Sequence, residues 1–262
     1  MAALPTLFIS HGSPMHALQP GAVRSVWEGL ARSLPWPKAI LIASAHWETD
    51  IPEVTGTAKP ETIHDFYGFP KPLYEIQYPA PGSPELALRS VELLKKSGFK
   101  AKEDPVRGLD HGAWSPLLHM YPKADVPVVQ VAVQTQLGTK HHLDLGRALA
   151  PLAQEGVLII GSGHMTHNLR DMARDGNAGG PAPYALEFQD WVKQRIDRHE
   201  LNELADYRKL SPAGVRAHPT DEHFLPLYIA LGAAGADYRA ERLYDGIEMG
   251  ALAMDAYRFT AA

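Results

Sequence analysis

Short apolar runs alternate along the chain with stretches in which apolar residues recur at helical spacing. Four runs are continuous, as expected for strands that helices bury on both faces. They cover residues 4–9, 39–43, 126–133 and 157–160. Buried strands of this kind are typical of a parallel sheet.

The stretches between these runs predict helices. In residues 22–34, Val23, Val26 and Leu30 fall on one stripe, and residues 83–96 open with the capping residue Ser83 and stop before Gly98. Further helices are expected at residues 141–153, 184–198 and 224–231. The alternation predicts an α/β fold with a mostly parallel central sheet flanked by helices, in which ligands bind beyond the carboxyl ends of the strands.

Composition and charge indicate the number of domains and the kind of partner. No Ser/Gly/Pro-rich linker or sustained charge run divides the 262 residues, so we expect one domain covering residues 1–262. The net charge of −5 comes with no basic patch, which argues against nucleic acid and anionic membranes and favours a small molecule. The apolar start has no basic flank and no run is long enough for a membrane span, so we expect a cytoplasmic protein. A monomer and a homo-oligomer are equally compatible with the sequence.

Thirteen histidines and no cysteine mean that imidazoles and carboxylates would hold any metal. His11 and His46 each follow a predicted strand. Because the carboxyl ends of parallel strands meet at one edge of a sheet, these two side chains should lie close together. Gly12 permits a close backbone approach beside His11.

Two further positions are candidates. His223 precedes the helix at 224–231, with Thr220 as its predicted cap, and the positive end of a helix dipole favours a neutral imidazole that can bind a metal. The competing interpretation is a surface histidine in the capping turn. His164 and His167 both lie in a glycine-rich turn after the strand at 157–160, and their spacing does not choose between them.

The other candidates are histidines on helices, nearby carboxylates, a proline-rich segment and two short motifs. Five histidines on predicted helices or helix starts are expected to be solvated: His16, His119, His141, His142 and His199. Four carboxylates near the candidate segments could fix an imidazole tautomer: Glu48, Asp65, Asp110 and Glu248. The segment 64–82, rich in proline and aromatic residues, is either an ordered loop over the site or a stiff surface connection. Gly161-Ser162-Gly163 lacks the lysine of a P-loop, and no G-x-S-x-G elbow supports a serine hydrolase.

Seven segments taken in order resemble a known family. They are Ser10-His11-Gly12-Ser13-Pro14-Met15, Ser44-Ala45-His46-Trp47, Ile63-His64-Asp65-Phe66-Tyr67-Gly68-Phe69-Pro70, Tyr78-Pro79-Ala80-Pro81-Gly82, Asp110-His111-Gly112, Ser162-Gly163 with His167-Asn168-Leu169, and Glu222-His223 with Leu225-Pro226-Leu227. The chain thus resembles class III extradiol ring-cleaving dioxygenases of the DOPA-dioxygenase type. The resemblance implies a single-domain α/β fold, a mononuclear non-haem Fe(II), and opening of a catechol ring by O₂.

The resemblance also implies roles. His11, His46 and His223 would be metal ligands, His167 a further ligand or an acid/base, and His111 a catalytic histidine beside them. Glu248 is the alternative source of a third ligand if the site has a carboxylate. Trp47 and the aromatic residues from Phe66 to Tyr78 are expected to enclose the substrate ring. An all-histidine site would also suit Zn(II), so the competing function is a zinc hydrolase that uses the same histidines to activate water.

Overall fold

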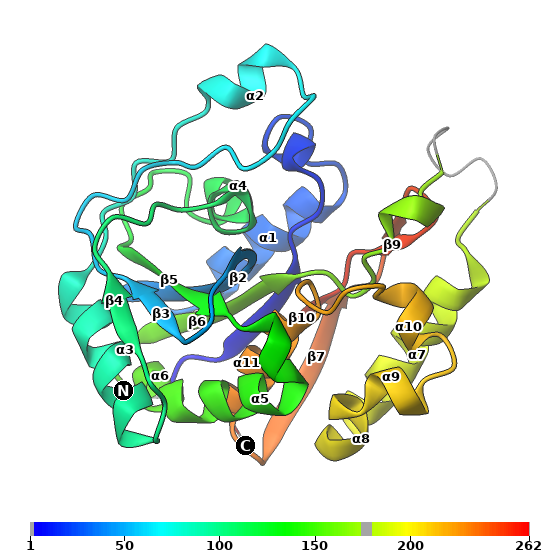
Figure 1. Cartoon of the computed structure of the whole chain (residues 1–262). Helices are drawn as coiled ribbons and strands as arrows, with labels where there is room; N and C mark the ends of the chain where they lie inside the picture. Colours follow the sequence, from blue (N-terminus) through cyan, green and yellow to red (C-terminus); the bar gives the residue numbers. More distant parts are fainter. Residues whose placement is uncertain (1–2, 174–179, 262) are drawn as a thin grey trace.

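The computed structural model describes residues 3–173 and 180–261. At its centre lies an eight-stranded sheet with helices on both faces (Figure 1), in the order β4-β3-β5-β2-β6-β1-β10-β7. Its strands are β1 (Thr6–Ser10), β2 (Ala39–Glu48), β3 (Glu53–Thr55), β4 (Lys102–Asp104), β5 (Val128–Val133), β6 (Val157–Gly163), β7 (Tyr238–Tyr244) and β10 (Ala256–Ala261). The central neighbours β5, β2, β6 and β1 pair in parallel, which confirms the predicted α/β fold with a mostly parallel sheet.

The four predicted strands correspond to β1, β2, β5 and β6. Along β2, Ile40 and Ile42 face one side of the sheet while Leu41 and Ala43 face the other, and helices bury both sides. Strand β2 continues to Glu48, where it still pairs with Val133 of β5 after an irregularity. His46 therefore lies within the end of a strand and does not follow it, which corrects the expected strand boundary.

Helices and short helical turns connect the strands. They are η1 (Pro14–Ala17), α1 (Val23–Ser33), α2 (Lys71–Glu75), α3 (Pro84–Lys96), α4 (His111–Met120), η2 (Thr135–Leu137), α5 (Gly138–Leu149), α6 (Pro151–Gln154), η3 (Leu169–Asp171), α7 (Pro183–Asp197), α8 (Leu201–Ala205), α9 (Tyr207–Leu210), α10 (Gly214–Ala217) and α11 (Leu225–Ala234). The Ser83 hydroxyl accepts a hydrogen bond from Leu86 N at 3.2 Å, so the predicted cap of α3 is confirmed. The single helix expected at 141–153 is two, because Pro151 has no N–H to continue α5.

Helix α11 packs directly behind the sheet. A side chain at Gly161 of β6 would bring a Cβ atom within 2.1 Å of the carbonyl oxygen of Pro226, so glycine is required for this approach. The helix begins at Leu225 after the cap position Phe224. Thr220 is therefore not the helix cap, and its hydroxyl donates instead to Glu222. His223 precedes the helix in a turn.

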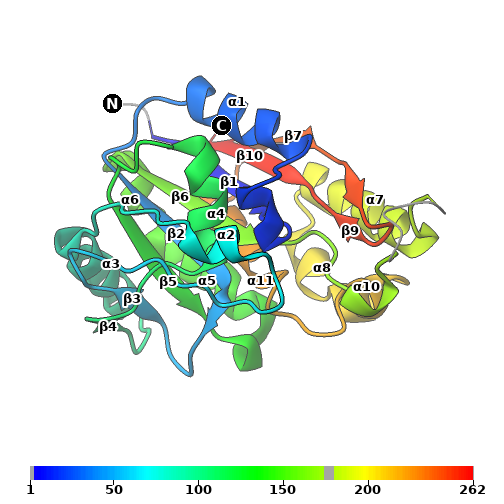
Figure 2. The same cartoon turned by 90° about the horizontal axis from the view of Figure 1, so that it is seen from above.

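The sequence pattern did not predict several strands. Strands β7 and β10 form an antiparallel edge beside β1, and β8 (Ile247–Glu248) and β9 (Leu252–Ala253) form a small separate hairpin. The segment 64–82 crosses the molecule near α4 (Figure 2), where the Phe66 ring contacts the rings of His111 and Trp114. Of the two interpretations left open by the sequence, the structure supports an ordered segment beside α4, part of which forms helix α2. Within the described residues, no helix is long and apolar enough to span a membrane.

Candidate metal and catalytic site

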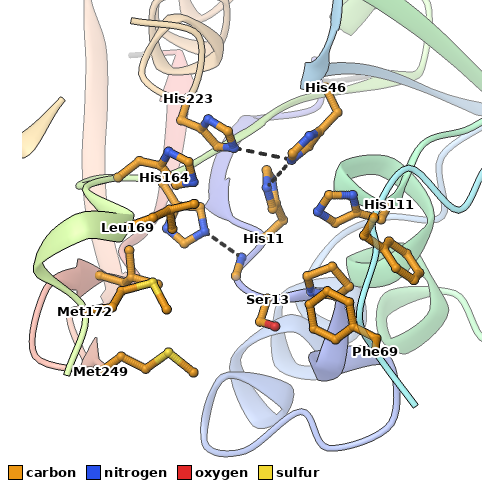
Figure 3. Close-up of a pocket in the computed structure, with 15 residues that line it drawn as sticks. His11, Ser13, His46, Phe69, His111, His164, Leu169, Met172, His223 and Met249 are labelled. Atoms are coloured by element: carbon orange, nitrogen blue, oxygen red, sulfur yellow. Dashed lines mark hydrogen bonds between the residues drawn. The ribbon is translucent and has the colours of Figure 1, made fainter. Parts of the chain in front are cut away.

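A cavity of about 350 Å³ opens where β1, β2 and β6 end. Six histidines gather in it, with apolar side chains around them (Figure 3). Its lining consists of His11, Gly12, Ser13, Pro14, His46, Phe66, Phe69, His111, His164, His167, Leu169, Met172, His223, Met249 and Leu252. This is the edge of the sheet at which the sequence predicts a ligand site.

Three of these histidines converge on one point. The Nε2 atom of His46 lies 3.0 Å from Nε2 of His11 and 3.3 Å from Nε2 of His223. His11 follows β1, where its N–H donates to the carbonyl oxygen of Gly163 in β6. The structure thus brings together, within 4.8 Å of one another, ligand atoms from residues far apart in the sequence.

Polar contacts at the far side of each ring, which are hydrogen bonds for His11 and His223, indicate the tautomers. His11 Nδ1 lies 3.1 Å from the Ser162 hydroxyl, which donates its own hydrogen to the Gly112 carbonyl and must therefore accept from the ring. His223 Nδ1 lies 3.0 Å from a Glu222 oxygen, and His46 Nδ1 lies 3.5 Å from Asp65 Oδ2. Carboxylates accept hydrogen bonds, so each Nδ1 carries the proton and each Nε2 presents a lone pair.

Three facing lone pairs fit a bound cation. Burial, followed by the neighbouring imidazoles, holds the pKa of His11 well below its usual range, and burial with the charge of His111 lowers the pKa of His46 to about 3. The rings are therefore neutral and able to bind a metal. Nitrogens bound at roughly 2.1 Å to one ion, at a right angle, lie about 3.0 Å apart, which agrees with the spacing here. Nitrogen ligands alone suit both iron and zinc.

His111 lies beside these three rings at the start of α4. Its Nδ1 lies 3.0 Å from Asp65 Oδ2, and its backbone N–H donates to Asp65 Oδ1 at 2.9 Å. Burial alone would raise the pKa of Asp65, but the hydrogen bond and charge of His111 lower it to about 2. The ionised carboxylate fixes the proton of His111 on Nδ1, so its Nε2 is available as a base.

His167 and His164 occupy different places. The His167 ring stacks on His223, and burial lowers its pKa to about 4. Its ring nitrogen groups with His223 and Glu222 rather than with the three converging Nε2 atoms. His164 is fully buried, and its Nε2 accepts a hydrogen bond from Gly12 N at 3.0 Å. Both residues line the cavity, and His164 holds the backbone next to His11.

Two histidines predicted to be solvated are buried. His16 Nε2 pairs with Glu248 Oε2 at 2.9 Å, and His142 accepts a hydrogen bond from Gln134 N while facing the Gly138 carbonyl. Both residues do lie on helical segments, as predicted. The spacing of apolar residues did not show, however, that these two side chains face neighbouring elements. His119 and His141 are partly buried, so that expectation fails for them too, whereas His199 is exposed as predicted.

Only some of the predicted carboxylates and aromatic residues contact the site. Asp65 contacts the site, whereas Glu48 accepts a hydrogen bond from Thr135 and Asp110 is buried behind the site with Ser44 and Gln130. Phe66 and Phe69 line the cavity, but Trp47 does not: it packs under the Arg107 guanidinium, 5.4 Å from the ring centre.

Sequence reasoning assigned no role at the site to four other cavity residues. Met249 and Leu252 come from the β8–β9 hairpin, and Leu169 and Met172 from the segment after β6. Their apolar side chains carry no local signal for a site, because only the tertiary fold brings them to the cavity. Ser162, for which the sequence predicted no contact with a histidine, fixes the His11 tautomer.

Comparisons with known proteins agree with this geometry. The family described as the catalytic LigB subunit of aromatic ring-opening dioxygenase matches residues 5–259. The chain is 46% identical to a 4,5-DOPA dioxygenase extradiol from Beta vulgaris, over 98% of this chain and 96% of that protein. It is 40% identical to one from Escherichia coli strain K12, over 96% and 93%.

A solved structure shares the fold as well. The crystal structure of an uncharacterised protein from Escherichia coli K12 superposes with a TM-score of 0.82 at 36% sequence identity, covering 97% of this chain and 99% of that one. The family match runs from before β1 into β10 and so extends over nearly the whole chain. The chain belongs to the LigB family of extradiol aromatic ring-opening dioxygenases.

Proposed function

We propose that this chain is a non-haem Fe(II) dioxygenase that opens a catechol ring, of DOPA or another catechol, beside its two hydroxyls, with residues 1–262 forming one catalytic domain. The observation that carries the proposal is the set of three Nε2 lone pairs facing one point in a cavity that holds further histidines. Relatives named 4,5-DOPA dioxygenase extradiol support a catecholic substrate. Both atoms of O₂ enter the ring-opened product.

His11, His46 and His223 would hold the iron. Three neutral protein ligands would leave coordination positions for other groups, and all three of these histidines line the cavity. When bound, Fe(II) supplies the open coordination positions for the catechol oxygens and O₂ and the redox chemistry that joins them. Glu248 is paired with His16, so we assign it no role as a ligand.

His111 is proposed to take a proton from the catechol. Asp65 accepts a hydrogen bond from its Nδ1, so Nε2 is the nitrogen that would take the proton, and the carboxylate would stabilise the imidazolium that forms. The pKa of Asp65 near 2 keeps that carboxylate ionised throughout. His111 would therefore act as the base when the substrate binds, and its proton remains available for a later step.

His167 is proposed as a second proton-transfer group. Burial lowers the pKa of its ring to about 4, and the ring lines the same cavity as His111. A neutral imidazole beside the substrate can accept a proton and return it without binding the metal. Phe66, whose ring contacts that of His111, and Phe69 would exclude water from the ring that is cleaved.

The test is oxygen uptake by the anaerobically Fe(II)-loaded chain against a panel of catechols. We expect one O₂ per catechol and a yellow ring-opened semialdehyde. The Zn(II)-loaded chain should be inactive, because zinc cannot pass an electron to oxygen. Equal turnover with the two metals, or turnover without oxygen, would overturn the dioxygenase and favour a zinc hydrolase.

A further inference from the structure

His46 lies where strand β2 has left its neighbours in the sheet. The ladder between β2 and β6 ends at the pair of Ser44 and Ser162. The pairing of β2 with β5 passes from Ala43 directly to Glu48. Within the described sheet pairs, the backbone of His46 therefore has no strand partner. Its N–H and C=O need other groups to bind them, and those groups also decide where the imidazole points.

Side chains bind both polar groups of this backbone. The N–H of His46 donates to the Ser44 hydroxyl oxygen at 3.2 Å, and the carbonyl oxygen of His46 accepts from Nη2 of Arg107 at 3.2 Å. The Ser44 hydroxyl donates in turn to Asp110 Oδ1 at 2.6 Å. The same Nη2 of Arg107 donates to Asp110 Oδ2 at 3.2 Å. Both connections end on one carboxylate, and we call Ser44, Arg107 and Asp110 the His46 clip.

The carboxylate at the centre of the clip is buried and fully engaged. Asp110 and Ser44 have no exposed surface, and Gln130 of β5 also donates to Asp110 Oδ2. The Arg107 side chain is 23% exposed and lies over the Trp47 ring. Three donors on one buried carboxylate hold each other in a single arrangement, because each bond is strong where water is excluded.

The clip also joins His46 to the helix that carries the proposed base. Asp110 precedes His111 at the start of α4, and its carbonyl accepts from two N–H groups of the first turn. The rings of His46 and His111 have centroids 3.9 Å apart (Figure 3). A Cβ atom at Gly112 would overlap the Ser44 hydroxyl and lie 3.1 Å from Cδ2 of His46, so glycine is required for this approach.

We propose that Arg107 and Asp110 are positioning residues that hold the imidazole of His46 where the three Nε2 atoms converge, and so set the metal affinity of the site. The inference rests on the proposed function, in which His46 is a metal ligand. The clip does not line the described cavity, so it acts only through His46. Without it, the strand end can shift, and the ion keeps two well-placed ligands in place of three. Groups that orient a metal ligand typically contribute 10- to 100-fold in affinity.

Substitution of Arg107 tests the clip in a folded chain. Arg107→Met removes the donor to His46 and to Asp110 but keeps an apolar stem beside Trp47. We expect its Kd for Zn(II), measured by competition with a chromophoric chelator, to rise about 10- to 100-fold. Ser44→Ala breaks the other connection and should also weaken binding. The visible absorption of the Co(II)-loaded variants should change as well, because it depends on how the ligands are arranged.

The chain offers a matched control at the other edge of the sheet. Arg242 donates to the buried carboxylate of Asp255 at 2.7 Å, and Gln189 donates to the same carboxylate at 2.7 Å. Arg242→Met therefore removes a similar buried contact away from the cavity. Urea unfolding of the metal-free chains should show a loss of stability in both Arg→Met variants. Only the Arg107 variant should lose Zn(II) affinity.

The outcomes separate this inference from the proposed function. An unchanged Zn(II) Kd and Co(II) spectrum in Arg107→Met and Ser44→Ala would overturn the inference and leave the proposed function intact. Equal weakening in Arg242→Met would also overturn it, because general loss of stability would then be the cause. If circular dichroism shows that Arg107→Met is unfolded, Ser44→Ala decides. Equal Zn(II) binding by wild type and His46→Ala would remove His46 from the metal site, and the proposed function would fail together with this inference.

Discussion

The ring of His167 lies flat against the ring of His223, with centroids 3.4 Å apart and planes 12° from parallel. A stacked ring approaches its neighbour through its face, whereas a metal ligand approaches through a nitrogen lone pair. His223 presents its Nε2 to His46 at 3.3 Å, so the contact with His167 leaves that nitrogen free. The stacking thus favours a proton-transfer role for His167 over a role as fourth ligand.

Replacing His167 with Phe keeps a ring against His223 and removes the proton-transfer group. We expect the variant to bind one iron per chain and to turn over about 100-fold more slowly, the usual scale for losing a positioned acid or base. Iron content and the single-turnover rate measure the two effects separately. Loss of iron in His167→Phe would make His167 a ligand.

The His111→Phe variant should also bind iron and catechol, because neither binding step requires a proton transfer by His111. Turnover should fall by about 100-fold or more. Asp65→Asn keeps the shape but cannot stabilise an imidazolium, so we expect a slower reaction with iron retained. Iron analysis, anaerobic catechol titration and turnover on both variants check this, with His199→Phe as a surface control. If His111→Phe loses iron, the division between ligands and proton-transfer groups is wrong.

The sequence predicted the parallel centre of the sheet because buried strands are continuous apolar runs that need no knowledge of their partners. It also anticipated that His11 and His46 would meet, since parallel strands end at one edge. The pairing of β10 with both β1 and β7 could not be predicted in this way. The order of strands along the chain does not determine which edge of the sheet a C-terminal strand joins.

Side-chain environment was less predictable than element type. His16 and His142 were expected in solvent, yet both are buried and hydrogen-bonded. Whether a polar residue near a helix start faces water depends on the element packed against it. The place of Met249 in the cavity was not predicted for the same reason, because its hairpin reaches the cavity only through tertiary contacts.

Changing His11, His46 or His223 singly to Ala should abolish stoichiometric metal binding while the fold is retained. Loss of one nitrogen leaves two neutral ligands, which hold a divalent ion far more weakly. Metal content after gel filtration, together with circular dichroism, checks both parts, and His199→Ala is the matched control. Full occupancy in His223→Ala would assign the third ligand to His167 or Glu248.

The contact between α5 and α11 predicts opposite effects for two glycines. At Gly146 of α5, an added Cβ would lie 2.2 Å from the Ile229 carbonyl oxygen, whereas at Gly29 of α1 it would meet nothing within 4 Å. Gly29→Ala should raise the free energy of unfolding by about 0.5–1 kcal/mol through helix propensity. Gly146→Ala should lower it by about 1–3 kcal/mol because the helices must separate. Denaturant unfolding measures both, and equal shifts would contradict the packing argument.

Acid stability should depend on His142, which is fully buried on α5. Its Nδ1–H donates to the Gly138 carbonyl at 2.6 Å and its Nε2 accepts from Gln134 N at 3.0 Å, so a second proton has no acceptor. Burial, with a smaller contribution from His141, lowers its pKa to about 3.

In the unfolded chain His142 takes up a proton as the pH falls below about 6.5, whereas in the folded chain it stays neutral until about pH 3. Above about pH 6.5 the imidazole is neutral in both states, so its titration does not lower the free energy of unfolding there. As the pH falls from about 6.5 toward about 3, this histidine should lower the free energy of unfolding by about 1.4 kcal/mol per pH unit. His142→Asn removes the titration, so its loss of stability should be largest near pH 7 and shrink toward pH 4. Urea unfolding of both metal-loaded proteins across this range measures the difference in slope, with His199→Asn as the exposed control. Parallel curves for wild type and His142→Asn would show that the folded chain accepts a proton on His142 after all.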